Sequence, residues 1–203
     1  MASTTQANRM LAIGGIVALL GILFAAIGFV VVGQAEHTAV KRPFELVDTH
    51  GRTVTEDVFR GRPSLVYFGY TNCPEVCPTT LMEMADWLGE LGPAGDEIQA
   101  LFFTIDPERD TPDVMAPYVA SISDRIVGVT GSAEEMRKAS QAWLVVARKD
   151  GDGGNYHLRH TTSLLMVGSD GRLKGLIPYG AAREEAIDKI RQVLLRAGPD
   201  RQS

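Results

Sequence analysis

The feature of the sequence that most constrains the fold is the stretch Tyr70–Pro78, which holds both cysteines of the chain, Cys73 and Cys77. The apolar run Leu65–Phe68 precedes it and is typical of a buried strand. A helix-like run, Thr79–Leu88, follows it. Both sulfurs are therefore predicted to lie where a strand gives way to a helix N-terminus. Unpaired amide N–H groups and the helix dipole at that position favour thiolate over thiol.

Composition limits the classes of function that this chain can serve. The 203 residues are 45% hydrophobic and carry a formal net charge of −5, which is ordinary for one sizeable domain with an appendage. Because phosphate binding needs a basic face, the mild acidity argues against a nucleic-acid partner. Two cysteines are too few for a disulfide framework in a chain of this size. They are more consistent with chemistry than with a structural scaffold.

The N-terminal part of the chain has the pattern of a membrane anchor. Arg9 is followed by an uncharged run, Met10–Gly33, which is long enough as a helix to cross the hydrocarbon core of a bilayer. The run is longer than the apolar core of a cleavable signal peptide. We therefore predict a short N-terminal segment over residues 1–9, a transmembrane signal anchor over 10–33 and a linker over 34–42. The expected location is the bacterial inner membrane, crossed once, with the long domain on the periplasmic side.

Strand-like and helix-like runs alternate beyond the linker and end in a hairpin followed by a helix. This order predicts an α/β domain over residues 43–196 with a mixed central sheet and a thioredoxin-like fold, followed by a tail over 197–203. Ser132 and Glu135 form a capping-box pattern that marks a helix start. The predicted strands cover residues 44–47, 53–55, 64–68, 101–105, 126–129, 144–147, 162–167 and 173–177. The predicted helices cover residues 79–88, a segment that starts at 112, 133–142 and 181–196.

The spacing of the two cysteines restricts what their sulfurs can do. Cys73 and Cys77 are four residues apart, so at the first turn of a helix both side chains lie on one face. Two such thiols can close a disulfide or hold a soft metal ion. Three intervening residues, instead of the two in the usual redox motif, favour the metal. Two thiolates suit Cu(I), and an added imidazole would make a trigonal site able to hold both Cu(I) and Cu(II).

The chain offers four histidines for that third position. His37 lies in the predicted linker, and His50 lies in a predicted turn of the first hairpin. His157 and His160 flank the start of a predicted strand far along the chain. Spacing alone does not choose between these last two residues.

Three motifs together resemble the Sco/SenC family. The run YFGYTNCPEVCP at residues 67–78 resembles the copper motif of that family. The segment DPERDTP at 106–112 is similar to its DPxRDTP segment, and GVTG at 128–131 is similar to its GLTG turn. The resemblance covers about residues 43–196. It implies a thioredoxin-like fold that binds one copper ion, as Cu(I) or Cu(II).

The resemblance also implies roles for particular residues. Cys73 and Cys77 take the positions of the two sulfur ligands, and they also form the redox-active disulfide pair. The histidine ligand of the family follows an aspartate at a strand start, which places His160 in that role and Arg159 in the place of the aspartate. Asp106 is a candidate for a residue that orients the metal ligands without binding the metal itself. The alternative for Asp106 is a carboxylate that caps its own loop through backbone N–H groups.

The function that the resemblance implies is a membrane-anchored copper chaperone. It would deliver copper to the cytochrome c oxidase subunit that carries the binuclear copper site, or it would prepare the thiols of that site. The alternative is a thiol–disulfide oxidoreductase or a redox sensor that acts on the cysteines of partner proteins. Because copper binds only the reduced sulfurs, we expect a thiol reductant among the partners, together with another copper carrier.

Overall fold

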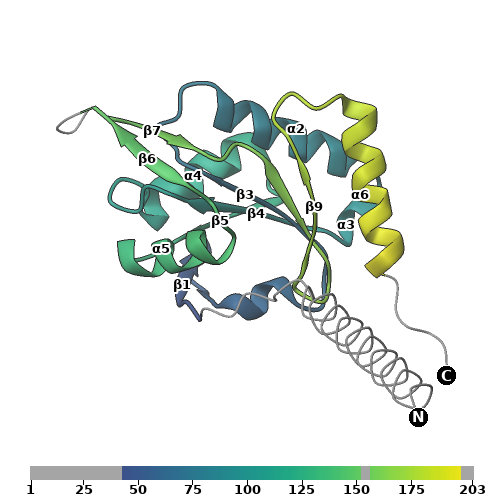
Figure 1. The fold of residues 1–203 in the computed structure, drawn as a ribbon, viewed down its shortest axis with the longest axis horizontal. Helices are drawn as coiled ribbons and strands as arrows, with labels where there is room; N and C mark the ends of the chain where they lie inside the picture. Colours follow the sequence, from purple (N-terminus) through teal and green to yellow (C-terminus); the bar gives the residue numbers. More distant parts are fainter. Residues whose placement is uncertain (1–42, 152–155, 198–203) are drawn as a thin grey trace, which may run out of the picture. The chain divides into compact units, whose positions relative to one another are not determined.

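The computed structural model describes residues 43–151 and 156–197 (Figure 1). Within these ranges no helix is long and apolar enough to cross a membrane. The predicted N-terminal segment 1–9, the signal anchor 10–33 and the linker 34–42 lie outside the described residues, as does most of the predicted tail. These assignments stay predictions.

A mixed seven-stranded sheet forms the centre of the domain, in the order β2-β1-β5-β4-β3-β8-β9. Its three middle strands run parallel, and the strands on either side pair antiparallel. The predicted α/β thioredoxin-like architecture with a mixed sheet is confirmed. The strands are β1 Leu46–Asp48, β2 Thr53–Val54, β3 Ser64–Gly69, β4 Gln99–Thr104, β5 Ile126–Thr130, β8 Leu164–Val167 and β9 Leu173–Ile177.

Strand β3 is buried along its whole length, because helices cover both faces of the sheet and a parallel strand in that position reads as a continuous apolar run. Its side chains alternate between the two faces. Leu65 and Tyr67 belong to one hydrophobic cluster, and Val66 and Phe68 belong to another. The cysteine stretch therefore begins at the end of a central, fully buried strand.

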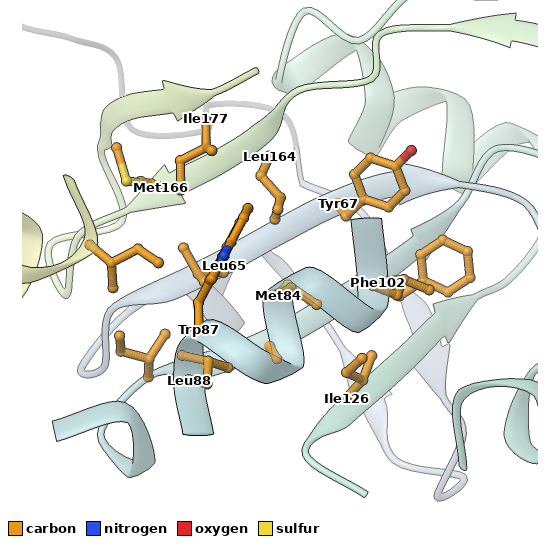
Figure 2. Packing of buried hydrophobic residues seen from close by; sticks show 14 of the residues in the cluster. Leu65, Tyr67, Met84, Trp87, Leu88, Phe102, Ile126, Leu164, Met166 and Ile177 are labelled. Carbon is orange, nitrogen blue, oxygen red and sulfur yellow. The ribbon is translucent and has the colours of Figure 1, made fainter. Parts of the chain in front are cut away.

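Helices α2, α4 and α6 pack on the Leu65 face of the sheet, and α5 packs on the other face together with the 3-10 helix η1. Trp87 and Met84 of α2 belong to the same buried cluster as Leu65 of β3 and Met166 of β8 (Figure 2). The helices are η1 Glu56–Phe59, α2 Val76–Glu90, α3 Pro93–Asp96, α4 Pro112–Ile122, α5 Ala133–Ala142 and α6 Arg183–Ala197.

The helix starts follow local sequence signals. Pro112 opens α4 at the position where its missing N–H costs nothing. The hydroxyl of Ser132 accepts a hydrogen bond of 3.2 Å from the N–H of Glu135, as the capping pattern predicts. In a full capping box the Glu135 carboxylate would also accept a hydrogen bond from the N–H of Ser132. That part of the prediction is wrong, because the carboxylate accepts from the N–H of Glu45 instead, at 2.9 Å.

The prediction of a strand over residues 144–147 is wrong. Leu144 and Val145 end helix α5: the N–H of Leu144 donates to the carbonyl of Gln141, and the N–H of Val145 donates to that of Ser140. This is a Schellman ending, which requires a left-handed residue just after the cap, and Leu144 has φ 55°. Strand β6 starts at Ala147 instead.

A second, two-stranded sheet lies beside the main one. It consists of β6 Ala147–Asp150 and β7 His157–His160, paired antiparallel so that Ala147 faces His160. Lys149 and Asp150 are the last two residues of β6. In Figure 1 this hairpin extends away from the main sheet on the side of α5. Residues 152–155 lie outside the described part of the chain.

Candidate metal centre

Residues 70–75, here called the cysteine loop, connect the end of β3 to the start of α2. Helix α2 begins at Val76, three residues earlier than the predicted Thr79. Cys77 consequently lies in the first turn of the helix, and Cys73 lies in the turn that precedes it. At Gly69 the chain passes so close to the site that an added Cβ would sit 2.9 Å from the sulfur of Cys77. A glycine is required at this position for the helix and its cysteine to pack against the strand.

The two cysteine side chains converge, as the four-residue spacing predicts. Both are free thiols, and the sulfur of Cys73 accepts a hydrogen bond of 3.4 Å from the N–H of Cys77. Their exposures differ: Cys77 is fully buried, whereas Cys73 is half-buried. The pair therefore presents one accessible sulfur and one enclosed sulfur.

The expectation that the helix N-terminus favours thiolate is wrong for Cys77. Burial raises the pKa of the Cys77 thiol to about 12, although a backbone hydrogen bond involving Tyr70 opposes the rise. The loss of solvation outweighs the helix N-terminus at this depth. A bound metal cation would favour the thiolate form of Cys77 again, since a thiol that coordinates a metal is deprotonated.

His160, at the end of β7, reaches this pair from the hairpin. Its Nε2 atom lies 3.7 Å from the Cys77 sulfur, and its Nδ1 atom lies 2.7 Å from the carbonyl oxygen of Thr161. Because a carbonyl can only accept, Nδ1 carries the proton, and the lone pair of Nε2 faces the sulfur. Burial lowers the pKa of His160, which keeps the ring neutral and able to bind a metal. His157, the other histidine that spacing allowed, is exposed on the same strand.

Two tyrosines form an aromatic wall around the imidazole. The rings of Tyr67 and Tyr70 each make an edge-to-face contact with the His160 ring, at centroid distances of 6.1 Å and 6.0 Å. The hydroxyl of Tyr67 also lies 3.7 Å from the Cys77 sulfur. Burial raises the pKa of Tyr67 far above its usual value, so this hydroxyl stays a hydrogen-bond donor to the sulfur.

The distance between the Cys77 sulfur and the Nε2 atom of His160 fits two atoms that bind the same metal ion. With the metal–sulfur and metal–nitrogen lengths of zinc sites, about 2.3 Å and about 2.0 Å, a trigonal angle separates the two atoms by about 3.7 Å. The contact between Cys77 and His160 has the same length, 3.7 Å. No group of three or more His, Cys, Asp or Glu residues in the described ranges is already arranged to hold an ion. The donors meet as two pairs, Cys73 with Cys77 and Cys77 with His160.

Asp106 is buried behind the site and is held by side chains. Its Oδ1 atom accepts a hydrogen bond of 2.6 Å from the Tyr156 hydroxyl, and its Oδ2 atom pairs with Arg109 Nε at 2.5 Å. These contacts are with side chains and not with the backbone N–H groups that a loop cap would use. Asp106 thus contacts Tyr156, the residue directly before the histidine strand β7, and its role in supporting the metal ligands stays a prediction.

Asp110 is a residue of the site that sequence reasoning missed. It is fully buried, and its carboxylate accepts hydrogen bonds from the N–H and the hydroxyl of Thr71 at 2.9 Å and 2.5 Å. It also accepts one of 2.6 Å from the Thr104 hydroxyl. The available signal was topological: β4 is the parallel neighbour of β3, so residues after both strands meet at one edge of the sheet.

Arg159, which stands where the family resemblance led us to expect an aspartate, does not place a positive charge on the imidazole. Exposure alternates along β7, so that Arg159 lies on the opposite face from His160. Its side chain is exposed and pairs with Asp150 across the hairpin at 3.1 Å. The charge is thus directed into solvent and partly neutralised.

These elements define a class of protein: a thioredoxin-like domain in which two thiols and one neutral imidazole meet at the edge of the sheet. A model of the SCO1/SenC family matches residues 32–195 of the chain. The chain belongs to this family.

Relatives of known structure have the same fold. The chain is similar to ScoI of Bradyrhizobium japonicum with copper bound, at 36% identity and a TM-score of 0.69, over 74% of this chain and 97% of that one. It is similar to yeast Sco1 with copper bound, at 29% identity and a TM-score of 0.70, over 79% and 93% of the two chains. The mitochondrial SCO2 homolog of Bos taurus is 34% identical over 154 residues, 73% of this chain. The alignments span between 58% and 65% of the length of three such curated relatives.

Proposed function

We propose that this protein binds one copper ion through Cys73, Cys77 and His160. The observation that carries the proposal is the 3.7 Å separation between the Cys77 sulfur and His160 Nε2, which suits two donors of one ion. Two soft thiolates favour Cu(I), and the neutral imidazole extends the site to Cu(II). The copper-bound relatives ScoI and Sco1 support the choice of metal.

The copper is cargo in this proposal. The protein is anchored to the bacterial inner membrane through residues 10–33. From the periplasmic side it delivers copper to the binuclear site of cytochrome c oxidase, or it prepares the thiols of that site. Family membership supports this assignment. Cys73 is the half-buried sulfur, so transfer starts there: an acceptor thiol forms its bond to Cu(I) as the bond to Cys73 breaks, and the proton that the acceptor thiol loses passes to the Cys73 thiolate. Cys77, the enclosed sulfur, releases the ion last.

The test is copper analysis of the full-length protein, purified in a mild detergent under reducing conditions. Wild type is expected to retain one copper per chain, and both Cys73→Ser and Cys77→Ser are expected to lose it. Transfer is then measured to a soluble oxidase domain that carries an empty binuclear site. A wild-type protein that retains no stoichiometric copper would overturn the proposal, and so would a Cys77→Ser variant that binds copper as the wild type does.

A second candidate, thiol–disulfide exchange, is favoured by the closeness of the two cysteines. The contact of 3.4 Å between Cys73 Sγ and the N–H of Cys77 leaves the half-buried sulfur of Cys73 able to attack a partner disulfide, with Cys77 as the resolving thiol. Such a reductase needs neither copper nor imidazole. Full activity on a disulfide substrate in His160→Ala, without added copper, would favour this candidate over the copper carrier.

A further inference from the structure

The strand that carries His160 is not part of the main sheet. Strands β6 and β7 pair only with each other in the described residues, and Figure 1 shows the hairpin extending from the body of the domain. The hydrogen-bond ladder of the central sheet therefore does not fix the imidazole in place. Its position depends on side-chain contacts between the hairpin and the body.

Tyr156, directly before β7, makes the most extensive of these contacts. It is only 6% exposed. Its hydroxyl donates to Asp106 at 2.6 Å, and its carbonyl oxygen accepts from Arg109 at 3.3 Å. The guanidinium carbon of Arg109 lies 3.8 Å from the centre of the Tyr156 ring. The ammonium of Lys149, which lies within the hairpin, is 3.7 Å from the same ring. One residue thus joins the hairpin to the loop after β4.

The same loop holds the other half of the site. Asp110 binds both the N–H and the hydroxyl of Thr71, two residues before Cys73. Asp106 and Arg109 bind Tyr156, four residues before His160. Residues 106–110 therefore connect the cysteine loop and the histidine hairpin, which are far apart in the sequence. Each half has its own attachment point on this short segment.

The attachment of the hairpin is the weaker of the two. Asp110 is fully buried and receives two hydrogen bonds from Thr71 of the cysteine half, and a third from Thr104 of β4 holds its carboxylate in place, all within 2.9 Å. In the hairpin contact, the Nη2 atom of Arg109 is buried without a hydrogen-bond partner among the described residues. An incompletely satisfied polar group lowers the cost of opening, since its pairing with water is regained when the contact breaks. The histidine half can therefore open while the cysteine half stays closed.

We propose that Tyr156 is a positioning residue that acts as a latch: its contact with Asp106 and Arg109 holds His160 against Cys77, and its release frees the imidazole while the two thiols stay in place. The latch rests on the proposed function for its purpose, because a bound ion then moves from three donors to two. Since only the imidazole leaves, the latch governs Cu(II) retention and leaves Cu(I) on its sulfurs.

The test compares full-length Tyr156→Phe with wild type. Losing a partner that orients a ligand typically costs tenfold to a hundredfold in metal affinity, and we expect a loss of that size for Cu(II). Cu(I) affinity should stay within twofold. The matched control is Tyr179→Phe, which removes the hydroxyl of an exposed tyrosine after β9 and should leave both affinities unchanged. Cu(II) affinity within twofold of wild type in Tyr156→Phe would overturn the latch.

Hydrogen exchange of the metal-free protein tests the latch independently of copper. A buried hydrogen bond to a carboxylate shifts a local opening equilibrium by roughly tenfold to a hundredfold. We therefore expect amides of β7 to exchange at least tenfold faster in Tyr156→Phe, and those of residues 71–77 to exchange unchanged. Asp110→Asn should show the reverse pattern. Faster exchange in both segments of Tyr156→Phe, or in neither, would overturn the latch, whereas a protein that binds no copper would overturn only the proposed function.

Discussion

The Nε2 atom of His160 lies 3.7 Å from the sulfur of Cys77, although 83 positions separate the two residues in the chain. The carbonyl of Thr161 fixes the proton on the far nitrogen of the ring. The free electron pair of Nε2 thus faces the Cys77 thiol, and the sulfur can join the ring nitrogen in binding an ion once the thiol loses its proton. The neighbouring thiol, Cys73, lies at the open side of the pair.

This relationship predicts a difference between two histidines of one strand. His160→Ala should retain Cu(I) on the two thiolates but lose the Cu(II) form, together with its sulfur-to-copper absorption band, because trigonal Cu(II) sites use an imidazole donor. His157→Ala is the matched control, because His157 is exposed on the opposite face of β7. Titration with Cu(II), followed by absorption and electron paramagnetic resonance, measures the effect. Equal Cu(II) spectra in the two variants would contradict the prediction.

The unequal burial of the thiols predicts an order of modification. Cys73 is half-buried and Cys77 is fully buried, so iodoacetamide should alkylate Cys73 first, by at least tenfold in rate, because accessibility controls which thiol reacts. Peptide mass spectrometry of the reduced, metal-free protein gives the two rates separately. In denaturant, the difference between the two rates should disappear. A faster reaction at Cys77 in the native protein would show that this sulfur is not enclosed.

Much of the fold follows from local sequence signals. The buried run before the cysteines became β3, Pro112 opened α4, and Ser132 capped α5. The failure at Leu144–Val146 has a physical cause: three apolar residues fit a buried strand and a helix ending equally well. Only the left-handed backbone of Leu144, to which the sequence gives no clue, distinguishes them.

The site was less predictable than the fold. The pairing of Cys73 with Cys77 follows from their spacing, but the choice of His160 over His157 depended on the family resemblance, because both lie at one strand start. Tyr156 gave no signal, since its partners lie 47 and 50 positions away in the sequence. The thiol of Cys77 was expected to ionise readily, and burial, which depends on the whole packed structure, reversed that expectation.

A buried carboxylate predicts part of the acid sensitivity of the fold. Asp48 is 2% exposed, and burial alone would raise its pKa. Hydrogen bonds from the N–H groups of Arg52 and His50 and from the Arg52 side chain outweigh burial, so that the pKa lies below its ordinary value of 3.8. The stability that this carboxylate contributes is therefore present above pH 3.8 and is lost as the pH falls through the depressed value.

Asp48→Asn should lower the free energy of unfolding by about 1–2 kcal/mol at pH 7, because hydrogen bonds to a charged group become neutral ones. The difference in free energy of unfolding between variant and wild type should decrease below pH 3.8, the ordinary pKa of an aspartate. Urea unfolding at several pH values measures it. Asp57→Asn is the control, since that side chain is 78% exposed in its pair with Arg60 and surface pairs contribute about 0–1 kcal/mol. A gap that stays constant from pH 7 to pH 3 would contradict the assignment.

The backbone of Leu144 predicts a stabilising substitution. This residue has φ 55° and is 86% exposed, so it bears the strain of the Schellman ending without burying its side chain. A left-handed conformation costs a residue with a Cβ roughly 1–2 kcal/mol, whereas glycine adopts it freely.

Leu144→Gly should therefore raise the free energy of unfolding by about 1 kcal/mol, after part of the relief is offset by the greater freedom of glycine in the unfolded chain. Leu195→Gly provides the control with the opposite sign. Leu195 is 82% exposed but lies within α6, where glycine costs up to about 1 kcal/mol. Urea unfolding of both variants beside the wild type separates the backbone effect from the loss of an exposed leucine. If both substitutions lowered the stability equally, the strain at Leu144 would not be released by glycine, and the helix ending would owe its shape to the leucine itself.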